Sequence, residues 1–350
     1  MKELLKRTEP FKNHIQHNGN GDPNYYIFHQ YKDNGLEEKA EKFYKYREAW
    51  EKARTSPEVS PHPLHISFAF QNSCNLECPH CYRQYNPNQY AQSVLPHEKI
   101  LQMIDECKAI GVPSIQLGAG IETFLYPKIN EVIEYIGKKG FEDFWIGTNG
   151  LRLTPERCDL ILDSNVTRLE VSMDAITPQT YAKSRGGDFY ALFKNVFTFL
   201  EKRNKRKLKL PMFRVSLVRY NLTKHEEEGF LNFWKPIADE VDVQPLIDVK
   251  NVNKLQYESI DPEKIHCKYP TNMMWIDWNG DYRPCCVDFS NLVQVGNIKD
   301  MGILEAWMCE KMRDLRDQLN RKKKLNKACV NCLRSMHSNE VYEVLPIKGS

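Results

Sequence analysis

The stretch LHISFAFQNSCNLECPHC occupies residues 64–81 and joins an apolar run to a loop that carries three cysteines. Its first part, LHISFAF, is short, apolar and aromatic, which predicts a buried β-strand. Its second part places Cys74, Cys78 and Cys81 in the spacing C-x3-C-x2-C. Three thiols so close together, in a chain without the marks of a secreted protein, indicate metal ligation or thiol chemistry at the end of that strand.

Further apolar runs follow this strand, and amphipathic, helix-like segments separate them. With the first run there are six, at residues 64–70, 114–118, 143–148, 168–173, 213–218 and 241–247. Strand-then-helix units in succession predict an α/β fold with a parallel sheet, either open and doubly wound or curved into an incomplete barrel. In both forms ligands bind at the carboxyl ends of the strands. The groups QNSC, GAGIE, TNG, SMDA and RYN stand at those ends.

The amino-acid composition indicates which classes of protein this chain could belong to. The 350 residues are 41% apolar and 27% charged, with a formal net charge of +3, as in ordinary globular proteins. This balance favours neither nucleic acid nor a membrane surface as a partner. Neither a signal peptide nor a run of 18 apolar residues is found, so we expect a cytoplasmic protein. The eleven cysteines are then expected to be reduced.

The first cysteine group has two chemical interpretations. Three thiolates on one loop can ligate three irons of a four-iron four-sulfur cluster and leave the fourth iron open for a chelating ligand. Alternatively, the thiols bind a structural zinc ion with His80 as the fourth ligand. The spacing and the position at the rim of a parallel sheet favour the cluster.

The motif resembles the signature of the radical S-adenosylmethionine (radical SAM) superfamily, and the resemblance covers about residues 61–345. It implies a partial (β/α)6 TIM-like barrel. It also implies that S-adenosylmethionine binds the open iron and that its reductive cleavage yields a 5′-deoxyadenosyl radical.

The same resemblance assigns roles at the strand ends. In AGIETFLYP, residues 119–127, Gly120 and Glu122 match the family's Gly-Gly-Glu-Pro stretch, whereas Ile121 and Thr123 depart from it. Glu122 is then expected to accept a hydrogen bond from the methionine amine.

Other matching residues follow the third and fourth strands. Asn149, Ser172 and Asp174 fall where similar enzymes hold the ribose and the carboxylate, and Arg185 is expected to bind that carboxylate. Without the thiols, Asn149 could belong to a simple turn, and Ser172 and Asp174 to a helix cap. His80 is expected to pack beside the adenine.

A second cysteine group lies near the carboxyl end of the chain. Cys267, Cys285, Cys329 and Cys332 have the spacing C-x17-C-x43-C-x2-C. Four thiolates fill every iron of one cluster, which leaves it suited to electron transfer, although a structural zinc ribbon uses the same ligands. The segments WIDWNGDYRPCC, VGNI, EAW and CVNC resemble the twitch, a shortened SPASM module that holds one auxiliary cluster. We expect a hairpin turn at Asn279-Gly280, one helix over residues 302–319 and a loop around CVNC.

These patterns divide the chain into three parts. We expect a mainly helical extension at residues 1–60 with one helix over residues 35–54, a radical SAM partial barrel at 61–258, and a small C-terminal twitch or SPASM-like cluster-binding module at 259–350. Cys107, Cys158 and Cys309 are expected to be core residues. Cys286 could either pack in the core or donate a hydrogen atom.

Several reactions follow from the resemblance. We expect two-electron oxidation of a sugar or aminocyclitol alcohol, with the auxiliary cluster as electron acceptor. The alternatives are epimerisation of a sugar or peptide with a cysteine hydrogen donor, modification of a ribosomal peptide, and a non-catalytic zinc-stabilised binding protein. A flavodoxin or ferredoxin is the expected electron donor. Polar residues expected near the substrate are Arg219, Asn221, Gln244 and Asp248.

Overall fold

In the described part of the chain the strands form one ten-stranded sheet, whose order is β1-β7-β6-β5-β4-β3-β2-β8-β9-β10. The computed structural model describes residues 14–17, 23–56, 58–85, 93–118, 120–247, 265, 267, 269–285, 287–288, 293, 295–322 and 325–337. The strands are β1 (His14–His17), β2 (His65–Phe68), β3 (Ser114–Leu117), β4 (Asp143–Thr148), β5 (Arg168–Ser172), β6 (Met212–Arg219), β7 (Glu240–Pro245), β8 (Met273–Ile276), β9 (Asp281–Arg283) and β10 (Gly296–Asn297).

Strands β2 to β7 pair in parallel and in chain order, which confirms the six predicted strands and the α/β class. This is the arrangement of a partial barrel of strand-then-helix units. The helices between and around them are α1 (Pro23–Asp33), α2 (Glu37–Thr55), α3 (His97–Ala109), α4 (Ile129–Lys139), α5 (Pro155–Asp163), α6 (Pro178–Ser184), α7 (Phe189–Lys205), α8 (Glu227–Trp234), α9 (Tyr269–Asn272), α10 (Ile303–Met308), α11 (Glu310–Asn320) and α12 (Lys327–His337). Short 3-10 turns lie at Tyr82–Gln84, Thr123–Leu125 and Lys224–Glu226.

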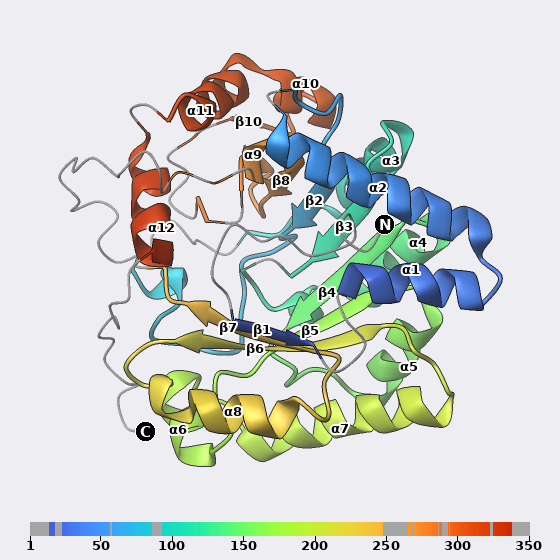
Figure 1. Cartoon of the computed structure of the whole chain (residues 1–350), viewed down its shortest axis with the longest axis vertical. Coiled ribbons are helices and arrows are strands. Elements are labelled where there is room, and N and C mark those ends of the chain that lie inside the picture. Colours follow the sequence, from blue (N-terminus) through green and yellow to red (C-terminus); the bar gives the residue numbers. More distant parts are fainter. Residues whose placement is uncertain are drawn as a thin grey trace.

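Alternation along the barrel strands β2 to β7 separates two environments. One side chain in two faces the surrounding helices and is fully buried in the main hydrophobic core, as are Ile115, Ile146 and Leu169. Figure 1 shows α7 and α8 packed on the side of β6 and β7. The intervening side chains face the inside of the barrel, and many of them are polar. The core therefore lies between the sheet and its helices, and the inside of the barrel is left for function.

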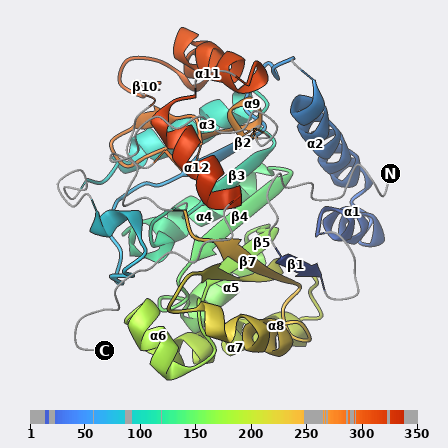
Figure 2. The ribbon, with the colours of Figure 1, turned by 60° about the vertical axis from the view of Figure 1, so that its left-hand side comes forward.

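The amino ends of the strands are closed by α1 and α2, which lie beside each other in Figures 1 and 2. Asn24 on α1 accepts a hydrogen bond of 2.7 Å from Arg168 at the start of β5. The ring of Trp50 on α2 makes an edge contact with His65 at the start of β2, with centroids 6.4 Å apart. A ligand is therefore expected to enter from the carboxyl ends of the strands. The sequence predicted α2 but not α1, whose buried face includes Asn24 and tyrosines and so shows a weak apolar period.

The C-terminal segment continues the barrel sheet. β8 pairs in parallel with β2, from His65 opposite Met273 to Phe68 opposite Ile276. β8 then turns through Asn279-Gly280 into the antiparallel strand β9, which confirms the predicted hairpin. Gly280 has a φ of +82°, a conformation that glycine adopts without strain.

Two C-terminal expectations were wrong in detail. Residues 302–319 form two helices, α10 and α11, because Cys309 between them is extended. Arg316 fills this break by stacking 4.0 Å from the Trp307 ring centroid and donating to the Trp307 carbonyl. The CVNC sequence lies in α12 and not in a loop, and the Asn326 side chain caps that helix by accepting from the Cys329 amide at 3.0 Å.

In the part of the chain that the structure describes, every helix is too short or too polar to cross a membrane. The boundaries predicted at residues 60 and 258 remain predictions.

The amino ends of the barrel strands, called the floor below, contain a buried histidine whose effect on stability can be tested by changing the pH. His65 is buried, with Nδ1 2.7 Å from the Ser114 hydroxyl, and burial lowers its pKa to about 4. Between pH 6.5 and pH 4 the unfolded chain therefore binds a proton that the folded chain does not, so stability falls as the pH drops through this window. The expected loss is about 3 kcal/mol.

The measurement compares urea unfolding of wild type and His65→Gln at pH 7 and pH 4. Between pH 7 and pH 4 the free energy of unfolding of the wild type should fall relative to that of the variant, because only the wild type has a buried neutral His65. A difference that does not change with pH would contradict the burial of a neutral His65.

Candidate active site

The three cysteines of the first group lie on one loop at the carboxyl end of β2. Cys78 is buried, Cys74 and Cys81 are half-buried, and the Cys81 amide donates to the Cys78 carbonyl at 3.0 Å. The neighbouring thiols help to raise the pKa of Cys78 and of Cys81, so the three sulfurs lie close together. The loop therefore gathers them at the rim that the sequence predicted.

Glu122 connects the ends of neighbouring strands. Its buried carboxylate accepts hydrogen bonds from the Thr148 hydroxyl at 2.7 Å, the Asn149 amide at 2.7 Å and the Phe124 amide at 3.1 Å. Its backbone carbonyl accepts from the Gln71 side chain at 2.9 Å. Burial raises the pKa of Glu122, and the hydrogen bonds oppose that shift. Glu122 therefore holds the loops after β2, β3 and β4 in fixed relative positions.

Asn149 extends this network to the cysteine loop. Its side-chain amide donates to Asn75 Oδ1 at 2.9 Å and lies 3.9 Å from Cys74 Sγ. Gly120 is held by the Tyr82 hydroxyl, which donates to its carbonyl at 2.7 Å. With a φ of +76° and Tyr82 only 3.0 Å from where a Cβ would lie, this position is suited to glycine.

Asp174 forms the opposite side of the site. It is fully buried with a φ of +59°, and its carboxylate accepts from Arg185 Nε at 2.8 Å and from the Val218 amide at 2.7 Å. His80 Nε2 lies 3.5 Å from the same carboxylate, and His80 Nδ1 lies 3.1 Å from the Tyr220 hydroxyl. Residues from the loops after β2, β5 and β6 thus meet in one cluster.

Burial controls the ionisation of this cluster. It lowers the pKa of His80 to about 4, so the ring is neutral at pH 7, and it raises the pKa of the Cys78 thiol to about 12. The positive charge of Arg185 opposes the shift at Cys78. Arg185 is thereby placed to favour the thiolate that iron ligation requires.

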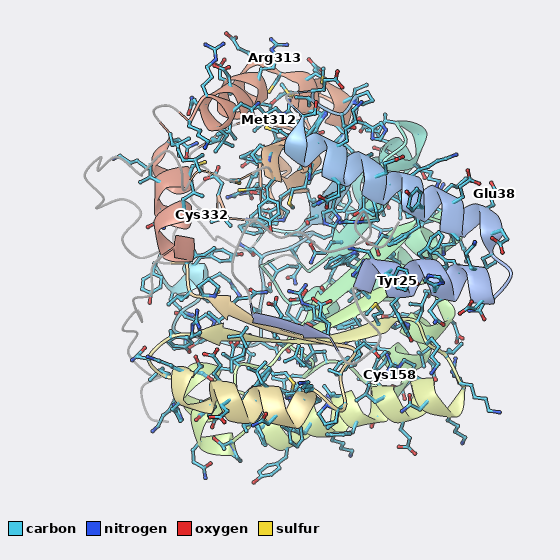
Figure 3. All side chains as sticks on the ribbon, in the orientation of Figure 1. Tyr25, Glu38, Cys158, Met312, Arg313 and Cys332 are labelled. Atoms are coloured by element: carbon cyan, nitrogen blue, oxygen red, sulfur yellow. The ribbon has the colours of Figure 1, made fainter. Side chains whose placement is uncertain are left out.

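The second cysteine group lies among the C-terminal elements. Cys267 and Cys329 pack on the small core formed by α11 and α12, and their thiols interact electrostatically. Cys332 follows one turn later on α12, as Figure 3 shows, and Cys285 follows β9. Burial raises the pKa of Cys329 to about 12, while the Asn326 amide, 3.3 Å from its sulfur, opposes that shift.

The donor sets fit iron–sulfur ligation better than a single metal ion. Within the described residues, no three side chains of His, Cys, Asp or Glu are gathered tightly enough for one ion. Tetrahedral zinc–sulfur bonds of about 2.3 Å would require sulfurs in mutual contact. A four-iron cluster spreads its thiolate ligands over separate irons, as a loop of three spaced cysteines allows.

The remaining predicted residues separate into two environments. Ser172 is partly exposed two residues before Asp174, and Gln244 faces the inside of the barrel, where it donates to Asp242 at 2.6 Å. Arg219 instead lies 3.6 Å from Glu227 of α8. Asp248 and Cys286 lie outside the described residues.

The structure also adds residues to the site that the sequence did not single out. These residues are Gln71, Asn75 and Tyr220. Each lies in or beside one of the polar groups at the strand ends, and this position in the sequence could have identified them as site residues.

Comparison with known families agrees with this geometry. Residues 68–227 match the model of the radical SAM superfamily, and residues 267–333 match that of SPASM, an iron-sulfur cluster-binding domain. The chain belongs to the radical SAM superfamily and carries a SPASM domain. The match covers both cysteine groups and the strand ends that surround the first of them.

Individual relatives are distant. The antilisterial bacteriocin subtilosin biosynthesis protein AlbA of Bacillus subtilis is 29% identical over 36% of this chain and 28% of its own length. A probable GTP 3′,8-cyclase of Methanocaldococcus jannaschii is 23% identical over 56% of this chain and 63% of its own length. The chain thus spans less than two thirds of either relative. The crystal structure of BtrN in complex with AdoMet and 2-DOIA shares the fold, with a TM-score of 0.53, 18% identity, and coverage of 81% of this chain and 98% of BtrN.

The Asp174–Arg185 ion pair gives a prediction about the stability of this radical SAM fold. Arg185→Met should lower the free energy of unfolding by about 3–5 kcal/mol, because it leaves the buried Asp174 carboxylate without its cation. Urea unfolding under anaerobic conditions measures the loss.

Arg206→Met is the matched control, because Arg206 pairs with Asp163 at the surface. The control should cost about 0–1 kcal/mol. If the free energy of unfolding fell equally in the two variants, the contribution of the Asp174–Arg185 pair to stability would not depend on its burial.

Proposed function

We propose that this protein cleaves S-adenosylmethionine reductively and oxidises an alcohol carbon of a sugar or aminocyclitol to a ketone by two electrons. The observation that carries the proposal is the presence, in one fold, of a three-thiol loop above a polar barrel interior and a separate four-thiol group. When bound, the cofactors supply a 5′-deoxyadenosyl radical and an acceptor for the second electron.

The chain's own residues would hold and orient these groups. Cys74, Cys78 and Cys81 would ligate the first cluster, and Cys267, Cys285, Cys329 and Cys332 the auxiliary one. Gly120, Glu122 and Asn149 on one side, and His80, Ser172, Asp174 and Arg185 on the other, would hold S-adenosylmethionine. The carboxylate of Glu122 already accepts three hydrogen bonds, two at Oε1 and one at Oε2. A methionine amine would therefore be bound as one further donor at Oε2, the oxygen that accepts a single bond.

The proposed oxidation removes one hydrogen atom, one electron and one proton from the substrate. A substrate C–H hydrogen passes to the deoxyadenosyl group, and the resulting radical loses one electron and one hydroxyl proton to give a carbonyl. The four-thiol group favours this course because four protein ligands leave no iron free for substrate, which suits electron acceptance. A flavodoxin or ferredoxin is the proposed source of the first electron.

The first test asks whether the chemistry is present. Anaerobically purified protein should be brown, contain about eight irons per chain, and form 5′-deoxyadenosine when given a strong reductant and S-adenosylmethionine. Cys78→Ala should abolish that product. Cys158→Ala is the control, because Cys158 is a buried thiol of α5, away from the cysteine loop (Figure 3). Zinc in place of iron would support a non-catalytic binding protein.

The second test separates oxidation from epimerisation. Turnover in deuterated solvent should yield a new carbonyl without deuterium at the reacting carbon. Deuterium retained there, and lost in Cys286→Ala, would identify an epimerase with a thiol hydrogen donor.

A further inference from the structure

Asn326 immediately precedes α12, the helix that carries Cys329 and Cys332. Its Oδ1 accepts a hydrogen bond from the Cys329 amide at 3.0 Å, and its backbone carbonyl accepts from the Val330 amide at 3.0 Å. The side chain is therefore the N-cap of α12, and Cys329 is the third residue of the helix. The cap holds the Asn326 side chain against the first turn.

The cap also determines which end of the Asn326 amide faces the cysteine sulfur. The Cys329 N–H is a donor and needs an oxygen, so Oδ1 lies toward the backbone and Nδ2 lies toward the thiol. Nδ2 is 3.3 Å from Cys329 Sγ, and this sulfur is its one acceptor among the residues that the structure describes. An amide N–H is thus directed at a predicted ligand of the auxiliary cluster.

The surroundings hold this N–H and the sulfur together. Leu325, the residue before Asn326, is buried in the small core against which Cys329 also packs. Asn326 is therefore anchored on one side by this core and on the other side by α12. A hydrogen bond beside an apolar core is electrostatically stronger than one in water, because the local dielectric constant is lower.

Asn149 at the first cysteine group shows a different arrangement. Its Nδ2 lies 3.9 Å from Cys74 Sγ and donates to Asn75 Oδ1 at 2.9 Å. The Asn149 amide is thus directed mainly at an oxygen, whereas the Asn326 amide is directed at a sulfur. The two side-chain amides therefore differ in how strongly they act on the cysteine beside them.

A hydrogen bond to a ligand sulfur changes the electron affinity of an iron–sulfur cluster. A cysteine thiolate that binds one iron keeps lone pairs that can accept an N–H. Reduction adds negative charge to the cluster and its sulfurs, so the hydrogen bond stabilises the reduced state more than the oxidised state. Hydrogen bonds to the sulfurs are accordingly among the factors that set the reduction potential. A donor to the Cys329 sulfur therefore raises the potential.

We propose that Asn326 is a positioning residue that raises the reduction potential of the auxiliary cluster through its N–H bond to the Cys329 sulfur. This inference rests on the proposed function, in which that cluster accepts one electron while the substrate radical loses one electron and a hydroxyl proton. A higher potential makes this electron transfer more favourable. Asp288 also interacts electrostatically with Cys329, and its negative charge acts in the opposite direction. The contribution of Asn326 is therefore measured by substitution.

The experiment is a redox titration of the anaerobic, cluster-loaded full chain, followed by electron paramagnetic resonance. The signal of the auxiliary cluster is the one that remains in Cys78→Ala. Asn326→Ser keeps an oxygen that can cap α12 and removes the amide N–H without adding charge. It should change the equilibrium constant for reduction of the auxiliary cluster about tenfold, which lowers the potential by about 59 mV for one electron.

Asn326→Asp tests the same contact with a side chain of nearly the same shape. Its carboxylate can cap α12, but it has no N–H and carries a negative charge, so the potential should fall at least as far as in Asn326→Ser. Asn34→Ser is the control, because the exposed Asn34 donates to the Gln30 carbonyl at 2.6 Å after α1, away from α12 (Figure 1). The control should leave the potential unchanged.

Two results would overturn the role of Asn326. One is a potential that stays at the wild-type value in Asn326→Ser and Asn326→Asp. The other is loss of the auxiliary cluster from both variants, because Asn326 would then act only as a helix cap.

The role of Asn326 and the proposed function fail separately, because the potential is measured without turnover. If the potential falls in both variants but the wild type forms no 5′-deoxyadenosine on reduction, the radical function is wrong and the role of Asn326 stands. If 5′-deoxyadenosine forms and the potential does not depend on Asn326, the role of Asn326 is wrong and the radical function stands. Zinc in the second cysteine group would overturn both the role of Asn326 and the auxiliary electron acceptor.

Discussion

The buried carboxylate of Glu122 holds the rim of the barrel together. A charged or polar oxygen without water must find donors, and Glu122 finds them in Thr148, Asn149 and Phe124. Since Asn149 also bonds to Asn75 beside Cys74, the same network fixes the cysteine loop against the sheet. Preorganisation of this kind allows a loop to hold an inorganic cofactor in one geometry.

Asp174 plays the equivalent part across the site. Its left-handed backbone and its bonds to Arg185 and the Val218 amide join the loop after β5 to β6. His80 brings the cysteine loop to the same carboxylate. Two buried acids thus join the loops of the rim, and each accepts hydrogen bonds from neighbouring strands or the loops that follow them.

The interior of the barrel is also polar. Arg214 on β6 lies within ion-pair distance of Glu170 on β5 and of Glu240 and Asp242 on β7. Burying a charged group is costly unless it is paired, and here the pairing joins three neighbouring strands across the inner face of the sheet.

The parallel strand order, the α/β class and both cysteine groups could be predicted from the sequence alone. These features can be recognised from short stretches of sequence. Each strand is a short apolar run, and the cysteines are recognised by their spacing. Family likeness extended this to the residues of the rim. Only the tertiary structure revealed that β8 joins β2, that α1 closes the floor beside Arg168, and that Glu170, Glu240 and Asp242 share one arginine. These contacts join residues far apart in the chain, and no local pattern specifies which distant side chains a curved sheet will turn toward the same interior.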